Sequence, residues 1–176
     1  MKMKALTIWQ PWASLIAIGA KPYEFRGWKP PRTLIGQRIA IHAGARPVRA
    51  SEVRALIWGL RGRAGSTNPC LVPEIALPVL ERVLRAFEKS PDTLFGTGEA
   101  ATLPLSHVIC TAVIGEPKRG DVCAAEFGEA AGNDSTRDGT FNWGWPMLDV
   151  RSVLPPYPAR GAQGLWDVFG LPKEGA

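Results

Sequence analysis

Three charged residues near the start of the chain have types and spacing that could bind an anion or transfer a proton. Lys21, Glu24 and Arg26 follow the helix-ending residue Gly19 in the segment GAKPYEFRGW (19–28). Side chains alternate between the faces of a strand, so Glu24 and Arg26 would point to one side, within reach of Lys21. Lys21 and Arg26 could then contact a phosphate, and Lys21 and Glu24 could transfer protons. The alternative is a surface ion pair without a function, which stabilises by at most about 1 kcal/mol.

Tryptophans surround this charged segment. The chain has seven of them, and Trp9 and Trp28 adjoin the charged residues in the sequence. An exposed indole ring can stack on a nucleobase, which makes these two rings candidates for contact with nucleic acid. The alternative for each ring is core packing, which we expect for Trp12 and Trp166.

Gln10 and His42 are further candidates for the same site. Gln10 belongs to the segment WQPW (9–12), and His42 lies on the strand face opposite Ile39 and Ile41. His42 could contact a ligand or act as a general base, whereas a lone histidine is more often a structural residue. Thr7 could face the same cavity, although nothing marks it as a nucleophile.

Other common catalytic patterns are absent from the sequence. Ser14 and Ser106 have no recognisable base partner, which argues against a serine hydrolase. No Walker loop, GxGxxG fingerprint or HExxH motif occurs, which removes the common NTPase, dinucleotide-binding and zincin classes. Cys70, Cys110 and Cys123 are widely spaced, so we expect reduced thiols and neither a disulfide framework nor a structural zinc site.

The elements that must position these residues are short and rich in glycine and proline. Alternating or apolar segments predict strands at 4–9, 24–28, 38–43, 107–115, 141–150 and 164–169. A short helix is expected after the first strand, beginning at Pro11 and ending at Gly19. The proline-rich segment 154–158 is expected to separate the last two strands. This pattern predicts an α+β fold built around a small β-barrel.

Two helices are expected in the middle of the chain. Apolar residues recur at helical spacing from Pro47 to Leu60 and again from Pro73 to Phe87. We expect these helices to form an insertion at about 47–104 within a single domain that spans residues 1–176. The segment 120–140 is rich in glycine, alanine and acidic residues, and we expect it to be a mobile loop.

Length, hydropathy and charge limit the class of protein. The 176 residues are enough for one domain with a sizeable core. No apolar segment approaches the roughly 20 residues of a membrane helix and no signal-peptide pattern occurs, so we expect a cytoplasmic location and no membrane contact. Residues 1–54 carry ten Lys and Arg against two acidic residues, whereas residues 55–176 carry eleven against fourteen. Positive charge concentrated in one part favours a polyanionic partner such as nucleic acid.

Part of this positive charge accompanies the first of the two middle helices. The residues concerned are Arg46, Arg49, Arg54, Arg61 and Arg63. A solvated helix face is the simplest interpretation. The alternative is a track for a phosphate backbone, which would make binding depend on salt concentration.

With its flanking segments, the charged motif resembles the ASCH domain (activating-signal-cointegrator homology) of the PUA-like β-barrel superfamily. The resemblance rests on WQPWA (9–13), the GxKxxExRxW pattern (19–28) and IAIHAG (39–44). The segments WGW (143–145), PPYP (155–158) and GAQGLW (161–166) extend it toward the end of the chain, while about 48–104 and 120–140 are left out. It implies an α+β fold, a small PUA-like β-barrel with a helix after the first strand, to which the two middle helices are an insertion.

The resemblance also implies a module that binds RNA or a nucleotide in a cleft beside the first helix. One branch of the family resembles an amidohydrolase acting on N4-acetylcytidine, in which the motif lysine assists a threonine at the position of Glu24. Another branch is credited with metal-dependent cleavage of single-stranded RNA. Here a glutamate replaces the threonine, which argues against the same acyl-transfer course, and no cluster of carboxylates stands ready for a divalent metal.

We therefore expect a binding module whose cleft, lined by Lys21, Glu24 and Arg26, recognises single-stranded RNA or a modified nucleotide. The expected nucleic-acid contacts come from Trp9, Gln10, Lys21, Arg26, Trp28 and His42. An enzyme is the alternative, with Lys21 and Glu24 as the catalytic pair: a ribonuclease, which would need a divalent metal, or an amidohydrolase. We expect no cofactor otherwise. A protein-interaction domain is a third interpretation.

Overall fold

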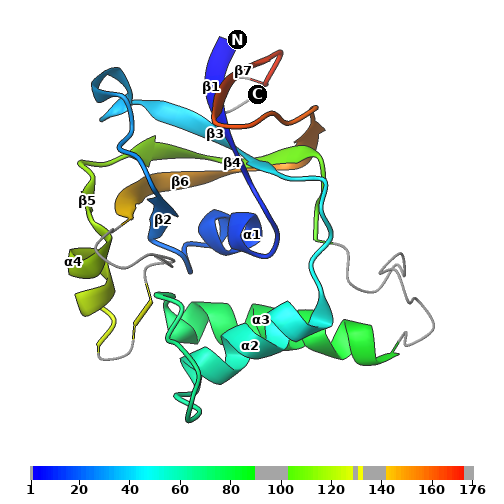
Figure 1. Ribbon diagram of the computed structural model, residues 1–176. Coiled ribbons are helices and arrows are strands. Elements are labelled where there is room, and N and C mark those ends of the chain that lie inside the picture. Colours follow the sequence, from blue (N-terminus) through cyan, green and yellow to red (C-terminus); the bar gives the residue numbers. More distant parts are fainter. Residues whose placement is uncertain (1, 90–102, 129–130, 133–141, 173–176) are drawn as a thin grey trace.

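The protein consists of a curved β-sheet with helices packed beside it (Figure 1). The computed structural model describes residues 2–89, 103–128, 131–132 and 142–172. The strands are β1 (Lys2–Ile8), β2 (Tyr23–Arg26), β3 (Arg38–Ala43), β4 (His107–Ile114), β5 (Lys118–Arg119), β6 (Trp143–Pro158) and β7 (Leu165–Phe169). The helices are α1 (Trp12–Ala17), α2 (Ala50–Leu60), α3 (Pro73–Lys89) and α4 (Gly120–Ala125), with a 3₁₀ turn at Arg32–Leu34.

The seven strands form one mixed sheet. Its order is β2-β6-β4-β3-β1-β7, and β5 pairs with β6 outside this path. β1 and β3 run parallel, with Thr7 opposite His42, and the other strand pairs are antiparallel. A mixed sheet with separate helices is the α+β fold class that the sequence predicts, and that prediction is confirmed.

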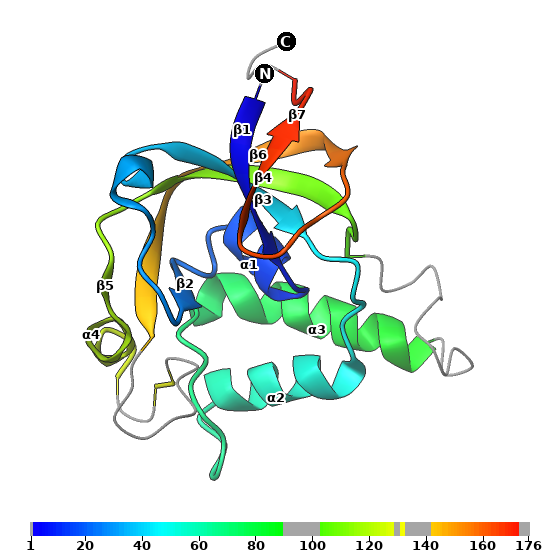
Figure 2. The ribbon, with the colours of Figure 1, turned by 45° about the horizontal axis from the view of Figure 1, so that its top comes forward.

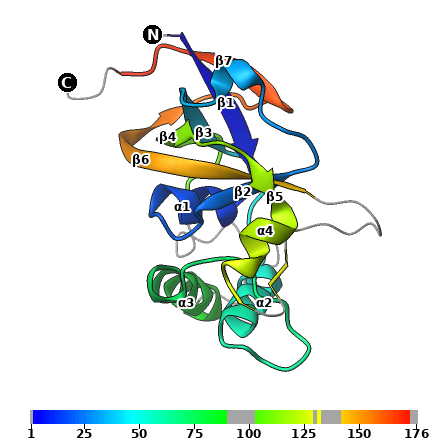
Figure 3. The same cartoon turned by 90° about the vertical axis from the view of Figure 1, so that its left-hand side faces the viewer.

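Helix α1 lies between the sheet and the two long helices α2 and α3 (Figure 3). Its residues Ala13 and Ile16 pack into the core formed by the sheet. Leu15 instead packs with Val53 of α2 and Leu80 of α3 in a second core. Apolar residues on both sides of a six-residue helix thus join the sheet to the helical layer.

Helices α2 and α3 follow β3 and precede β4 in the chain, and they lie side by side (Figure 2). α3 begins at Pro73, where a proline has no amide hydrogen to leave unpaired. Ala76 and Leu80 of α3 are fully buried against α2. Among the described residues, no helix is long and apolar enough to cross a membrane.

One expectation about the C-terminal strands is wrong. The proline-rich segment 154–158 does not separate two strands but forms the end of β6. Among the described strands, only β4 pairs with β6 there, because β2 and β5 pair with residues 143–146 of β6. A proline lacks the amide hydrogen that a second neighbouring strand would need, so prolines are tolerated at such an edge.

The expectation of a mobile loop over 120–140 is wrong for its first part. Gly120–Ala125 form α4, which places the fully buried Cys123 against Gly144 of β6. A Cβ atom at Gly144 would lie 2.4 Å from the Cys123 sulfur, so a glycine is required for this contact. Residues 129–130 and 133–141 lie outside the described residues.

The three cysteines are buried, and none of them forms a disulfide bond. Burial raises the pKa of the Cys110 thiol to about 12, and burial also raises the pKa of the Cys123 thiol. Both thiols therefore stay protonated at neutral pH and behave as small apolar side chains.

Candidate functional site: a charged cleft beside the first helix

A cleft of about 530 Å³ opens where β1 ends and α1 begins. Its walls come from four parts of the chain: residues 7–9, Trp12 of α1, the charged segment 21–26 and the connection 162–164 between β6 and β7. The cleft therefore needs the parallel pairing of β1 with β3, the return of the chain through β2, and the closing strand β7.

Lys21, Glu24 and Arg26 meet in this cleft. Lys21 Nζ lies 3.0 Å from Glu24 Oε2, and Arg26 Nε lies 3.0 Å from Glu24 Oε1. The side chains of Lys21 and Glu24 are only 4% and 9% exposed. This pair is therefore buried, unlike the surface ion pair that was the alternative interpretation of the spacing.

The local backbone holds the two cations in place. Lys21 Nζ donates a hydrogen bond to the carbonyl oxygen of Tyr23, and Arg26 Nη2 donates to the carbonyl oxygen of Thr7 at 3.1 Å. Arg26 Nε is buried 3.0 Å from Glu24 Oε1 but makes no hydrogen bond among the described residues. One carboxylate between two cations leaves the site with an excess positive charge.

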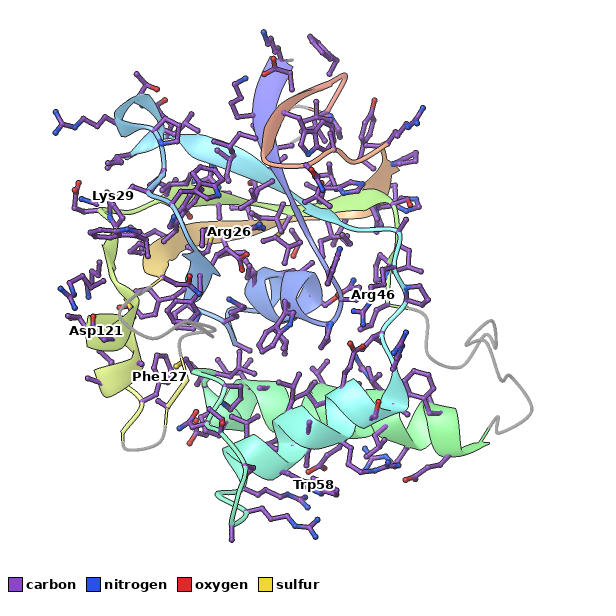
Figure 4. The ribbon with its side chains drawn as sticks, viewed as in Figure 1. Arg26, Lys29, Arg46, Trp58, Asp121 and Phe127 are labelled. Carbon is purple, nitrogen blue, oxygen red and sulfur yellow. The ribbon has the colours of Figure 1, made fainter. Side chains whose placement is uncertain are left out.

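Aromatic rings form the sides and the mouth of the cleft. Lys21 Nζ lies 5.4 Å from the ring centroid of Trp12 and 5.3 Å from that of Phe25. Trp9 is 59% exposed, and the guanidinium of Arg46 lies 4.8 Å from its ring centroid. Figure 4 shows Arg26 and Arg46 near opposite ends of α1. The mouth of the cleft therefore presents the large aromatic surface of Trp9 beside the guanidinium of Arg46.

The connection from β6 to β7 closes the cleft through close packing on β1 and β3. Trp166 Nε1 donates a hydrogen bond of 3.0 Å to the hydroxyl oxygen of Thr7, whose backbone carbonyl holds Arg26. A Cβ atom at Gly161 would lie 2.5 Å from His42 Cε1 and 2.9 Å from the Thr7 hydroxyl oxygen. Only a glycine at 161 allows the connection to pass this close.

His42 lies behind that connection rather than in the cleft. Its Nε2 lies 3.0 Å from the carbonyl oxygen of Ala159, which can only accept, so Nε2 carries the hydrogen. Nδ1 is buried and has no hydrogen-bond partner in the described part of the chain. Burial lowers the pKa of His42 below its usual value, and the hydrogen bond to Ala159 partly offsets this. The ring therefore stays neutral at neutral pH.

Four of the predicted site residues line the cleft: Trp9, Lys21, Glu24 and Arg26. Gln10 does not, because its buried side chain accepts from the Ser14 amide at 3.2 Å and donates to the Pro104 carbonyl at 2.8 Å. Trp28 lies beyond the end of β2, where its ring packs edge-on against Trp145 with centroids 4.7 Å apart. Together with His42, these residues support the fold around the cleft.

Sequence reasoning missed several lining residues. Trp12 was assigned to the core, whereas it borders the cleft and packs against both cores. Phe25 follows Glu24 in the strand and so carried no polar signal. Residues 162–164 lie far along the chain, and the only signal for them was the segment GAQGLW (161–166).

The cleft does not fit a divalent metal. Among the described residues, no group of three or more His, Cys, Asp and Glu side chains lies close enough together to hold a metal ion. Glu24 is the single carboxylate of the lining, and both of its oxygens already face cations. A hard divalent cation prefers several oxygen ligands, which this lining does not supply.

The family model of the ASCH domain matches the chain over residues 6–93, and no curated protein matches it. The matched range contains all of the charged motif. It also runs through α2 and α3, which the resemblance left out, and ends before the segments of 143–166 that were counted toward it. ASCH domains have the PUA-like β-barrel fold and are generally associated with RNA binding. The match covers half of the chain, and the protein therefore belongs to the ASCH domain family.

Proposed function

We propose that the cleft binds single-stranded RNA or a modified nucleotide, with Lys21 and Arg26 as the residues that contact the ligand. The observation that carries this proposal is the buried arrangement of one carboxylate between two cations. It leaves excess positive charge in a cleft of about 530 Å³, a volume typical of ligand sites. Phosphate oxygens and base carbonyl oxygens are the acceptors that lysine and arginine N–H donors bind.

Trp9 adds a surface for stacking. Its ring is largely exposed at the mouth of the cleft, and Arg46 lies over it. An exposed tryptophan beside cations is a common arrangement in proteins that bind single-stranded nucleic acid, where each stacked base contributes about 1–3 kcal/mol. A base at Trp9 would leave its phosphate or its carbonyl edge near Arg26 and Lys21.

Glu24 is better suited to positioning than to proton transfer. One of its oxygens faces Lys21 and the other faces Arg26, so both are engaged before any ligand arrives. Its contribution to binding is the orientation of the two cations.

Binding measurements on charge-removing variants test the proposal. We expect Lys21→Met and Arg26→Met each to weaken binding of a labelled single-stranded RNA by about 10-fold or more, because each removes a charge-assisted hydrogen bond. Each change should also lower the slope of log K against log salt by about 1 if its cation contacts a phosphate. Lys4→Met is the matched control, because Lys4 is exposed and pairs with Asp167 away from the cleft. Folded variants that bind like the wild type would contradict the proposal.

Hydrolysis is the alternative function that the same proteins test. If Lys21 and Glu24 transfer protons, wild-type protein should turn over labelled RNA or N4-acetylcytidine, and Glu24→Gln should abolish that turnover. The recognition proposal expects no turnover above the Glu24→Gln level, with or without Mg²⁺. The two proposals are therefore separated by one assay series.

A further inference from the structure

A second hollow of about 410 Å³ lies next to the cleft and is not part of it. It is enclosed by α2, by the connection 65–69 between α2 and α3, and by Trp12 of α1. Trp12 is common to the linings of the hollow and the cleft. The two are therefore neighbours that share one aromatic wall.

The outer rim of this hollow repeats the arrangement at the mouth of the cleft. Trp58 of α2 is 40% exposed, and the guanidinium of Arg63 lies 4.1 Å from its ring centroid. At the cleft, Arg46 lies over Trp9 in the same manner. Trp58 lies on the outer part of α2 in Figure 4. Each hollow thus has an exposed indole with a cation beside it.

The wall formed by 65–69 is held rigidly against α2. A Cβ atom at Gly59 would lie 2.2 Å from the carbonyl oxygen of Thr67, so the connection runs directly over the helix backbone. Ser66 Oγ lies 3.1 Å from the carbonyl oxygen of Trp58 and donates to it, and Asn68 Nδ2 donates to the Phe127 carbonyl at 2.9 Å. Because these polar groups are satisfied internally, the hollow presents a preformed and mostly apolar surface.

The charge around the hollow selects the kind of ligand. Arg63 lies over the ring of Trp58 at the hollow, whereas Arg46 pairs with Glu52 and Arg61 pairs with Glu81. None of the described residues that line the hollow is acidic. A flat heteroaromatic group attached to a negatively charged backbone suits this combination, since the ring can stack on the indole of Trp58 while the backbone meets the guanidinium of Arg63.

We propose that the hollow is a second base-binding subsite for single-stranded RNA, occupied by a base of the same strand whose neighbour fills the cleft. Trp12 separates the two bases, and Trp58 with Arg63 stacks on the second. This inference rests on the proposed function of the cleft and extends it, because it makes the ligand a strand rather than a single nucleotide. Stacking reads no hydrogen-bonding edge, so the second subsite accepts any base.

The test measures how RNA affinity depends on strand length in proteins with and without the second subsite. Binding of uridine monophosphate and of oligouridylates from two to eight nucleotides is measured for wild type, Trp58→Ala and Arg63→Ala. We expect wild-type affinity to rise once the strand reaches the second subsite. Trp58→Ala should remove about 5- to 100-fold of the affinity for the long strand, as expected for one lost stacking contact. Its affinity for the mononucleotide should equal that of the wild type.

Phe169→Ala is the matched control. Phe169 is 62% exposed on β7 and has Lys2 5.8 Å from its ring centroid, so it is also an exposed ring beside a cation. Strand β7 lies away from the helical layer (Figure 1), and we expect the loss of the Phe169 ring to leave both affinities unchanged. As a second readout, RNA carrying 4-thiouridine should cross-link to the peptide that contains Trp58.

The outcomes separate this inference from the proposed function. If Trp58→Ala and Phe169→Ala bind the long strand equally well, the second subsite is wrong while the cleft proposal stands. A wild-type affinity that does not rise with strand length leads to the same conclusion. If Lys21→Met binds as tightly as wild type, or if wild type binds none of these probes, the cleft proposal fails and the second subsite fails with it.

Discussion

Glu24 controls both the stability and the charge of the cleft, because it is the only anion between two buried or partly buried cations. We predict that Glu24→Gln lowers the free energy of unfolding by about 3 kcal/mol or more, since removing one partner leaves buried charge uncompensated. The same change should strengthen the binding of inorganic phosphate, because the positive charge that the cleft gains outweighs the loss of the orientation that Glu24 gives to Lys21 and Arg26. Urea unfolding and phosphate titration measure the two effects.

Glu81→Gln provides the comparison at a surface pair. Glu81 of α3 accepts a 2.7 Å hydrogen bond from Arg61, which is 61% exposed. Solvent screens such a pair, so its loss should cost about 1 kcal/mol or less. If both variants lost the same free energy of unfolding, the buried contacts of Glu24 with Lys21 and Arg26 would be no stronger than a surface ion pair.

We predict that His42 makes the free energy of unfolding depend on pH. Burial lowers its pKa in the folded protein, while the unfolded chain keeps the usual value of 6.5. The unfolded state therefore binds the proton first as the pH falls, and stability is present above pH 6.5 and is lost toward the lowered pKa. We expect a lower urea midpoint at pH 5.5 than at pH 7.5. In His42→Gln, which keeps a donor for Ala159, most of this difference should disappear; an unchanged difference would assign it to another group.

At the scale of elements, the connection between β6 and β7 is the wall of the cleft that depends on a single glycine. We predict that Gly161→Ala weakens binding of ligands in the cleft several-fold, because its Cβ would collide with His42 and Thr7 and displace residues 162–164. Gly27→Ala is the control, since its Cβ would meet nothing closer than 3.9 Å. Binding isotherms for the two folded variants check the prediction. Equal affinities would show that this connection does not shape the site.

The elements with strong local patterns were predictable from the sequence. The alternation of residues 38–43 gave β3 its correct bounds, and Pro73 marked the first residue of α3. The same reasoning brought Glu24 and Arg26 to one face of β2, because strand side chains alternate. These features depend only on residues close together in the chain.

The features that local patterns did not predict depend on partners far along the chain. Pro155, Pro156 and Pro158 are compatible with a strand because none of the described strands pairs with that edge of β6, which no local pattern reveals. His42 could have been a general base or a structural residue, and Gly161, which lies close against its ring, is more than 100 residues later in the chain. Gln10 likewise finds its partner at Pro104. Tertiary pairing therefore decided which polar residues reach the cleft.

At the scale of the whole molecule, α1 links the sheet to the helical layer, and we propose that the chain unfolds as a single domain. We predict that Leu80→Ala, at a fully buried residue of the second core, lowers the free energy of unfolding by about 2–5 kcal/mol. Because Leu15 of α1 shares that core, the transition should shift as one unit. Circular dichroism and tryptophan fluorescence should therefore give coincident curves, whereas two separate transitions would contradict the proposal. Leu154→Ala, at an exposed residue of β6, should change stability by less than about 0.5 kcal/mol.

Trp9 and Trp145 differ in exposure to solvent, so their intrinsic fluorescence can report separately on the cleft and on the core. Trp145 is completely buried and bonded through its indole N–H to the carbonyl oxygen of Trp28, whereas Trp9 is open to solvent at the cleft. Indole in water emits at longer wavelengths than indole in a core, so the red edge of the emission spectrum reports mainly on exposed rings such as Trp9. A base stacked on Trp9 would quench that edge and leave the blue emission of Trp145 unchanged. Ligand screening can thus proceed on the unlabelled protein, with Trp9→Phe as the silent reference.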